Sequence, residues 1–160
     1  MKRNIKQIVE SLEIGDTNVE VELVEALESV SGSEAFIKLD IETISKTLKK
    51  ESGIGIFSSD FLGDVGDVVT SGRDQVLGAF QHAMRLVSDD GKIEIRKQVK
   101  NAKTIVSIIR GTKNLGLSVV EEAISLLKSE TNAKDIFIGA DCSMEKGVRV
   151  VLITASSESE

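Results

Sequence analysis

Four side chains that can carry chemistry lie close together in the first third of the chain: Lys38, Asp40, Glu42 and Thr43. A carboxylate can act as a general base, and an ammonium group can pair with an anion. Thr43 cannot act as a base, and Glu42, one position before it, is rotated by about 100° around a helix. Asp40 stands directly before an apolar helical pattern, and this place indicates an N-cap.

Three carboxylates and one histidine are the residues to weigh as metal ligands. Asp60, Asp64 and Asp67 do not follow the Asp-x-Asp-x-Asp-Gly spacing of a calcium loop. A solvated loop explains them better. His82 lies off the apolar stripe of its helix and has no cysteine or acidic partner at metal-binding spacing. The sequence therefore predicts no metal site and a surface histidine.

The remaining candidates are also better explained by structure than by catalysis. Cys142 has no nearby histidine to activate a thiolate. Glu121 and Glu122 stand at an expected helix start, where the helix dipole favours carboxylates, and Ser118 with Glu121 forms a capping-box pattern. No acid, base and nucleophile converge, so we expect no catalytic residue and no cofactor.

Composition narrows the class of protein. A formal charge of −6, with no Trp or Tyr and only five Phe, argues against a nucleic-acid binder. A single cysteine excludes an internal disulfide and fits a reducing compartment. No apolar run approaches the roughly 18 residues of a transmembrane helix, and no apolar segment of a signal peptide follows Met1. These features predict a cytoplasmic protein with no transmembrane segment.

The elements that must position these residues follow from hydrophobic periodicity. Residues 3–13 predict a helix, and residues 19–31 fit either a strand or, better, a helix. Further helices are expected at 40–50, 74–88 and 118–128, and strands at 53–57, 104–109, 135–140 and 148–154. Residues 58–72 read as a loop, and 92–100 as an edge strand or extended link. The last two strands are predicted to form a hairpin, because seven residues between them are too few for a helical crossover.

This order predicts an α/β (α+β) fold with a mixed four-stranded sheet. The helices at 74–88 and 118–128 should pack on one face of the sheet if both crossovers are right-handed and the sheet grows in one direction. The expected domains are a helical N-terminal arm (1–32), the sheet domain (33–155) and a disordered tail (156–160).

Four stretches, in order, resemble the second (C-terminal) domain of FtsZ, the tubulin-like division GTPase. Residues 36–44 resemble its Asn-x-Asp-x-x-Asp loop and helix start, with Lys38, Asp40 and Thr43 at the three polar positions. The other three are Gly72-Arg73-Asp74, then residues 102–111 with 115–127, and finally residues 132–154. The resemblance spans residues 33–155 and implies an FtsZ C-terminal-domain-like fold without the GTPase domain.

The resemblance implies an interaction protein that has lost the family's chemistry. In the family, the acidic loop polarises a water at a neighbour's nucleotide, and here only Asp40 of the three positions keeps its residue type. No stretch reads as a phosphate loop, since the carboxylates of residues 63–67 would repel phosphate. We expect no GTP hydrolysis by this chain alone. Lys38, Asp40, Glu42 and Thr43 become candidates for a subunit interface in a cell-division or cytoskeletal filament, with this chain itself or an FtsZ-type GTPase as partner.

Three alternatives stay open at this stage. The simpler interpretation, which we favour at this stage, is that Asp40 only caps its helix and Lys38 is solvated. The chain also fits a small-ligand-binding or enzymatic homo-oligomer with sites between subunits. Finally, the N-terminal 32 residues, rather than the sheet domain, fit the role of partner contact.

Overall fold

The central element of the protein is a four-stranded mixed sheet. The computed structural model describes residues 5–32, 35–49, 52–61, 73–113 and 115–156. The sheet strands are β1 (Ser52–Phe61), β4 (Thr104–Arg110), β5 (Asp135–Asp141) and β6 (Val148–Ser156). They lie in the order β1-β6-β4-β5. Strand β6 runs antiparallel to both of its neighbours, and β4 and β5 are parallel. The predicted mixed four-stranded sheet is confirmed.

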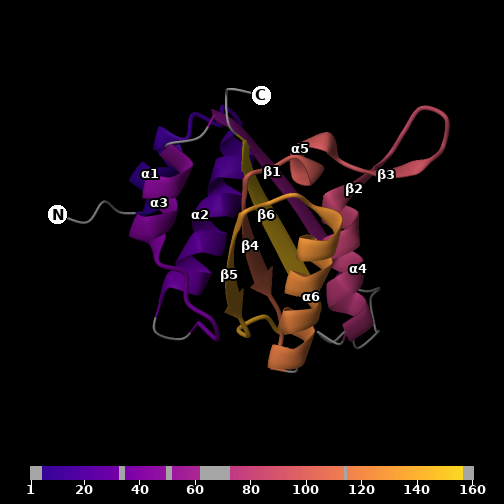
Figure 1. Ribbon diagram of the computed structural model, residues 1–160. Coiled ribbons are helices and arrows are strands. Elements are labelled where there is room, and N and C mark those ends of the chain that lie inside the picture. The colour runs from indigo at the N-terminus through magenta and orange to yellow at the C-terminus, as the bar shows by residue number, and fades with distance from the viewer. Residues whose placement is uncertain (1–4, 33–34, 50–51, 62–72, 114, 157–160) are drawn as a thin grey trace.

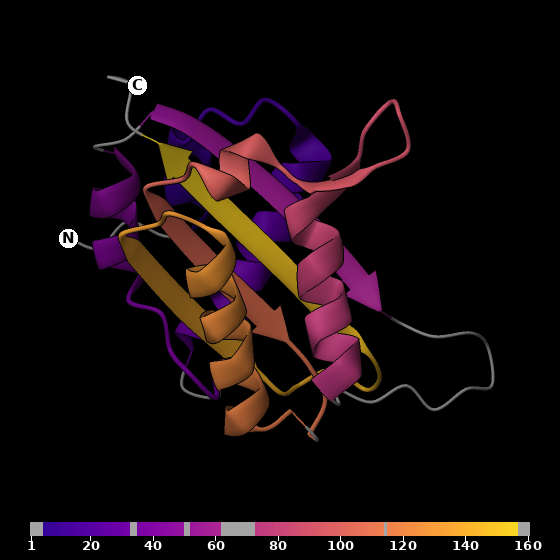
Figure 2. The same ribbon diagram turned by 45° about the vertical axis from the view of Figure 1, so that its right-hand side comes forward.

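Helices cover both faces of this sheet (Figures 1 and 2). One face carries α4 (Arg73–Met84) and α6 (Leu117–Glu130), and the other carries α1 (Ile5–Ser11), α2 (Thr17–Ser31) and α3 (Ile41–Lys49). The crossovers from β1 to β4 and from β4 to β5 move across the sheet in the same direction. Right-handed crossovers then place both connecting helices on one side. The prediction that these two helices share a face is confirmed.

The N-terminal segment packs against the sheet. Residues 17–31 form a helix, which resolves the ambiguity between strand and helix. Helix α2 contacts β4 and β5, and its Leu23 and Val30 are fully buried. A domain boundary at residue 32 stays a prediction, but both helices before it contribute apolar side chains to the packed layer.

Strand β4 explains why the sheet is covered twice. Ile105 and Ile109 enter the core beneath α4 and α6, whereas Val106 and Ile108 enter the core beneath α1–α3. A strand that is apolar on both sides must be buried on both sides. Its β-branched side chains also suit the pleated, buried surface.

The predicted hairpin between the last two strands is wrong. Strand β6 pairs with β1 and β4, and β5 pairs with β4 at the sheet edge. Residues 142–147 therefore pass over the end of β4 rather than making a tight turn. This link is long enough to cross two strand spacings, about 10 Å. The almost completely buried β4 is better placed with a partner strand on each side, and the link length alone did not reveal this.

The predicted helix at 74–88 ends early, at Met84. The chain continues into a separate hairpin of β2 (Arg85–Val87) and β3 (Ile93–Ile95), whose turn contains Gly91 at φ +83°. The Arg96 amide then donates to the Met84 carbonyl, which closes the hairpin base. Val87, expected on the buried stripe, is 68% exposed. A short helix, α5 (Lys97–Lys100), replaces part of the extended link expected at 92–100.

Strand β1 is longer than its apolar run. It was expected at 53–57, but it continues to residue 61 because every residue from Gly55 to Phe61 pairs with β6. The first part of the predicted loop at 58–72 is therefore strand. The rest of that loop, including Asp64, Asp67 and Gly72, lies outside the described residues.

The capping box predicted at Ser118 and Glu121 is wrong. Helix α6 begins at Leu117, and its N-cap is Gly116, which makes no side-chain cap. Ser118 lies inside the first turn, two residues after the N-cap position. The clearest side-chain cap is instead Asp16 before α2, whose Oδ1 accepts from the amides of Asn18 and Val19 at 3.0 and 3.3 Å.

These two helix starts give a paired prediction. Asp16→Ala should lower the free energy of unfolding by about 1 kcal/mol, because it leaves amides of the first turn without their acceptor. Ser118→Ala should change it by less than about 0.5 kcal/mol, as expected of a surface position without a capping role. Urea unfolding followed by circular dichroism measures both values. An equal loss at the two positions would contradict the assignment of the caps.

Candidate functional site

The loop that carries the predicted interface residues is held at both sides by backbone hydrogen bonds. Ile37 and Ala140 exchange a pair of amide–carbonyl bonds of 3.0 and 2.9 Å, which adds a bridge to the open edge of β5. The Leu39 amide donates to the Val30 carbonyl at 2.8 Å, and the Leu39 side chain is only 6% exposed. The loop is therefore attached to both the sheet and α2.

Successive residues of this loop alternate between inside and outside. Ile37 and Leu39 face the protein, whereas Phe36, Lys38 and Asp40 are exposed. Phe36 is 43% exposed, so a large aromatic residue is accessible beside Lys38. The outward side of the loop thus presents an aromatic ring, a cation and a carboxylate on a constrained backbone.

Asp40 caps α3, as its position predicted. Its Oδ1 accepts from the Thr43 amide at 3.3 Å, and its Oδ2 accepts from the Thr43 hydroxyl at 3.0 Å. The loop that this stretch resembles has a carboxylate at the position of Thr43. Here the Thr43 side chain is a hydroxyl, and it donates to Asp40. Glu42, the residue directly before Thr43, is half-buried. The structure brings Asp40 and Thr43 together as a capping pair, and this pairing directs the Asp40 carboxylate toward its own helix.

Close to this loop, a row of four charged residues crosses the whole sheet. Adjacent strands place Asp60, Arg149, Arg110 and Asp141 side by side in that order. Arg149 donates to both oxygens of Asp60, at 2.7 and 3.2 Å, and Arg110 Nε lies 3.8 Å from Asp141 Oδ2. The row lies on the face that carries α1–α3, at the end of the sheet nearest the loop.

Several carboxylates lie around Arg149 of this row. Hydrogen bonding to Asp60 raises the pKa of Arg149, and Glu22 and Glu25 of α2 add a smaller Coulombic effect. Asp141 is 3% exposed and also accepts from the Ser143 hydroxyl. One pair joins β1 to β6 and the other joins β4 to β5, at the same end of the sheet. They position the end of β5, to which the loop is attached.

Sequence reasoning missed this row, although it did consider Asp60 in another role. Asp60 belongs to an ion pair on β1 and not to a loop. Arg110 is the last residue of β4 and Arg149 the second residue of β6, so a charged residue at the end of an apolar run was the available signal. Their neighbours could not be known without the order β1-β6-β4-β5.

The other sequence candidates lie apart from the loop. His82 is exposed on α4, and Glu122 pairs with Arg73 at 2.6 Å on the opposite face of the sheet. In the described part of the chain, no group of three His, Cys, Asp or Glu is placed to hold a metal ion. Within the same residues, no helix has the length and apolar character needed to cross a bilayer.

Cys142 follows the charged row and gives a prediction about thiol reactivity. Partial burial, and secondarily the charge of Asp141, raise the pKa of its thiol. The thiolate is the reactive form, so Cys142 should react severalfold more slowly with a disulfide reagent at pH 8 than the same cysteine in the urea-unfolded chain. Asp141→Asn should bring the reaction rate of the folded thiol closer to that of the unfolded chain. A folded thiol that reacts as fast as the unfolded one would contradict the prediction.

Comparisons with known proteins identify the fold. No protein-family model matches the chain, and no curated protein matches it. Among solved structures, an empty FtsZ dimer from M. jannaschii matches with a TM-score of 0.59 and 13% identity, over 96% of this chain and 44% of that one. CetZ2 from Haloferax volcanii, a GTPγS-bound protofilament, matches with a TM-score of 0.62 and 14% identity, over 88% and 37%.

A third structure agrees with these two. GDP-bound monomeric CetZ1 from Haloferax volcanii gives a TM-score of 0.54 at 14% identity, over 90% of this chain and 42% of that one. The chain spans less than half the length of each structure it matches. The predicted resemblance is confirmed: the chain has the fold of the C-terminal domain of FtsZ-like proteins.

Proposed function

We propose that this chain works through protein–protein assembly, with the outward side of residues 36–43 as its contact surface. The observation that carries the proposal is the loop geometry. Backbone bonds to Val30 and Ala140 fix the loop, while Phe36 and Lys38 remain exposed. A constrained loop loses little conformational entropy on binding. An exposed aromatic ring beside a cation is also a typical composition for an interface centre.

The proposed partners are further copies of this chain or a filament of FtsZ or CetZ type. The matched structures include a dimer and a protofilament, and this chain has the fold of 44% and 37% of those chains. The Lys38 ammonium can pair with a carboxylate or a phosphate of the neighbour. Such a role places the protein in the cytoplasm, in cell division or in another cytoskeletal process.

The contact we propose is non-catalytic. Asp40 is engaged by the Thr43 amide and hydroxyl, and Thr43 offers no base. These 160 residues also contain no stretch that reads as a phosphate loop. A molecule that offers the loop side alone would bind one end of a filament and present no nucleotide site to the next subunit. The expected effect is to limit filament growth without hydrolysing GTP.

Sedimentation of the FtsZ-type filament from the same organism tests this function. Adding the chain should lower the pelleted polymer mass or shorten the filaments, and part of the chain should co-pellet. The rate of GTP hydrolysis by the chain alone should equal the buffer background. Unchanged polymer with no co-pelleting, together with no self-association in analytical ultracentrifugation, would rule out the proposal.

Reversing the charge of the loop cation gives a sharper prediction. Lys38→Glu should weaken binding to the filament, or self-association, by about tenfold, because a carboxylate would then face an acidic partner group. Lys97→Glu is the matched control, since Lys97 is also exposed but lies on α5, away from the loop. Equal effects of the two variants would show that overall charge, rather than the loop, controls binding.

A further inference from the structure

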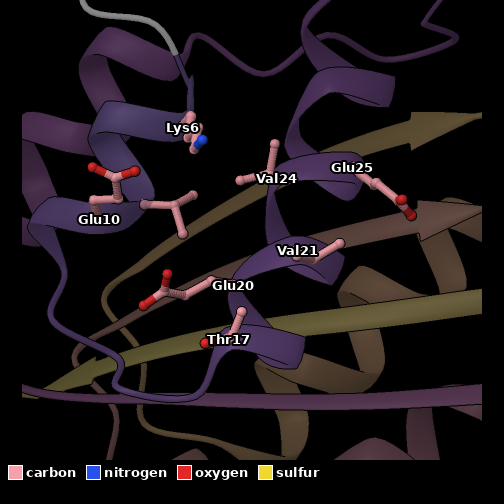
Figure 3. Close-up of a pocket in the computed structure, with 8 residues that line it drawn as sticks. Lys6, Glu10, Thr17, Glu20, Val21, Val24 and Glu25 are labelled. Carbon is pink, nitrogen blue, oxygen red and sulfur yellow. The ribbon is translucent and has the colours of Figure 1, made fainter.

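The two N-terminal helices enclose an apolar groove that is separate from the loop. Figure 3 shows it between α1 and α2, with the Glu20 side chain extending from α2 toward α1. Its volume is about 320 Å³, and its apolar lining consists of Val9, Val21 and Val24. Val9 is fully buried at the floor, whereas Val21 is 54% exposed at the edge. The volume suits one or two inserted side chains, because it is at the lower end of the range for ligand pockets.

The rim of this groove carries an unusual concentration of negative charge. Glu10, Glu20 and Glu25 line it, with Lys6 as the one cation in the lining. Residues 5–31 hold seven carboxylates and a single lysine, a net charge of −6 that equals the charge of the whole chain. The positive and negative charges of the other residues therefore cancel. The field over α1 and α2 is strongly negative, and it favours a cationic ligand.

We propose that this groove binds a basic amphipathic helix of a partner protein. A groove between two helices matches the shape of a third helix, which would place one or two apolar side chains over Val9 and Val24. Lysine or arginine side chains that flank this apolar stripe would reach Glu10, Glu20 and Glu25. The acidic rim therefore favours a basic ligand, and the valines favour a ligand with an apolar stripe.

A second copy of this chain fits the groove poorly. Among the described residues, the most exposed apolar pair is Val87 and Ile93 on the β2–β3 hairpin. That hairpin also carries Asp89, Asp90 and Glu94, which would repel the acidic rim. The basic stretch at 96–103 offers no exposed large apolar side chain. A separate polypeptide that combines both properties is therefore the better match.

Synthetic peptides test the groove with the intact chain. One 18-residue helical peptide carries leucines on one face and lysines around it. A second has the same composition in scrambled order, and a third replaces the lysines with glutamates. Fluorescence anisotropy should show micromolar binding of the first peptide, at least tenfold weaker binding of the other two, and marked weakening in high salt, because salt screens exposed charges. Equal binding of the scrambled peptide would overturn the proposal, because charge alone would then explain binding.

Variants locate the site on the protein. Val21→Asp should weaken binding of the first peptide by at least tenfold, and Glu20→Gln together with Glu25→Gln should weaken it by about fivefold. Glu28→Gln is the matched control, since Glu28 is an exposed carboxylate of α2 outside the groove. Circular dichroism verifies that each variant is folded. Equal loss in the control, no binding by the intact chain, or a dimer that Val21→Asp dissociates would each overturn the proposal.

Discussion

Gly139→Ala should lower the free energy of unfolding by about 2 kcal/mol, the typical cost of overpacking a filled core. A Cβ at this position of β5 would lie 2.7 Å from Leu39 Cγ and 2.8 Å from Val30 Cβ. Leu39 belongs to the proposed contact loop, and Val30 belongs to α2. The added methyl group must therefore push the loop away from the sheet. Urea unfolding measures the loss of stability.

The same substitution also tests how the loop is held. Hydrogen exchange at the Ile37 amide should accelerate, because this amide donates to Ala140 of β5 across the gap that the methyl group would widen. Gly78→Ala is the control, since nothing lies within 4 Å of a Cβ placed there. In the middle of α4 it should instead stabilise the protein by up to about 1 kcal/mol. A stabilising effect at both glycines would show that β5 and α2 have room to separate.

The sequence was sufficient for most of the elements but not for their lateral order. Helical periodicity located α4 and α6, and β-branched runs located β4 and β6, because these patterns reflect burial of one face or of both. The place of β6 between β1 and β4 depends on contacts among residues far apart in the chain. The short link between β5 and β6 indicated that these two strands form a hairpin. In the sheet β6 instead lies beside β4, because the buried β4 needs a neighbouring strand on each side.

The candidate site was likewise predictable only in part. Residues 36–43 were found by their resemblance to a known loop, and the capping role of Asp40 followed from its position before an apolar pattern. The attachment of Ile37 to Ala140 depends on the sheet edge, which no local signal reveals. The ion pairs of Arg110 and Arg149 were missed for the same reason. Until the strand order is known, nothing shows which residues lie beside either arginine.

The apolar groove and the contact loop lie on different parts of the α1–α3 layer, and α2 connects them. Val30, near the C-terminal end of α2, accepts the Leu39 amide of the loop, whereas Val21 and Val24 line the groove nearer its N-terminal end. A partner helix seated on α2 would leave Phe36 and Lys38 accessible. The two proposed surfaces are therefore compatible with simultaneous occupancy, which would let the chain connect a filament to a second protein.

Arg110→Met should lower the free energy of unfolding by about 3 kcal/mol, because it leaves a buried carboxylate without its cation. The side chains of Arg110 and Asp141 are only 20% and 5% exposed. The exposed pair of Arg73 and Glu122 is the control. Its atoms are closer, at 2.6 Å, but its side chains are 62% and 46% exposed. Arg73→Met should therefore cost no more than about 1 kcal/mol, since water and salt screen that pair.

A double-mutant cycle separates the loss of a favourable pair from the cost of an unpaired buried charge. Arg110→Met combined with Asp141→Leu should be within about 1 kcal/mol of the unmodified chain, because apolar side chains of similar size often replace a buried ion pair without loss. The coupling energy should then be at least about 2 kcal/mol. If the two single losses simply add, Arg110 and Asp141 stabilise the sheet independently, and the charged row does not act as a unit. Strong coupling of Arg110 and Asp141, together with a small effect of Arg73→Met, would instead show that burial, rather than the distance between charged atoms, determines how much each ion pair contributes to stability.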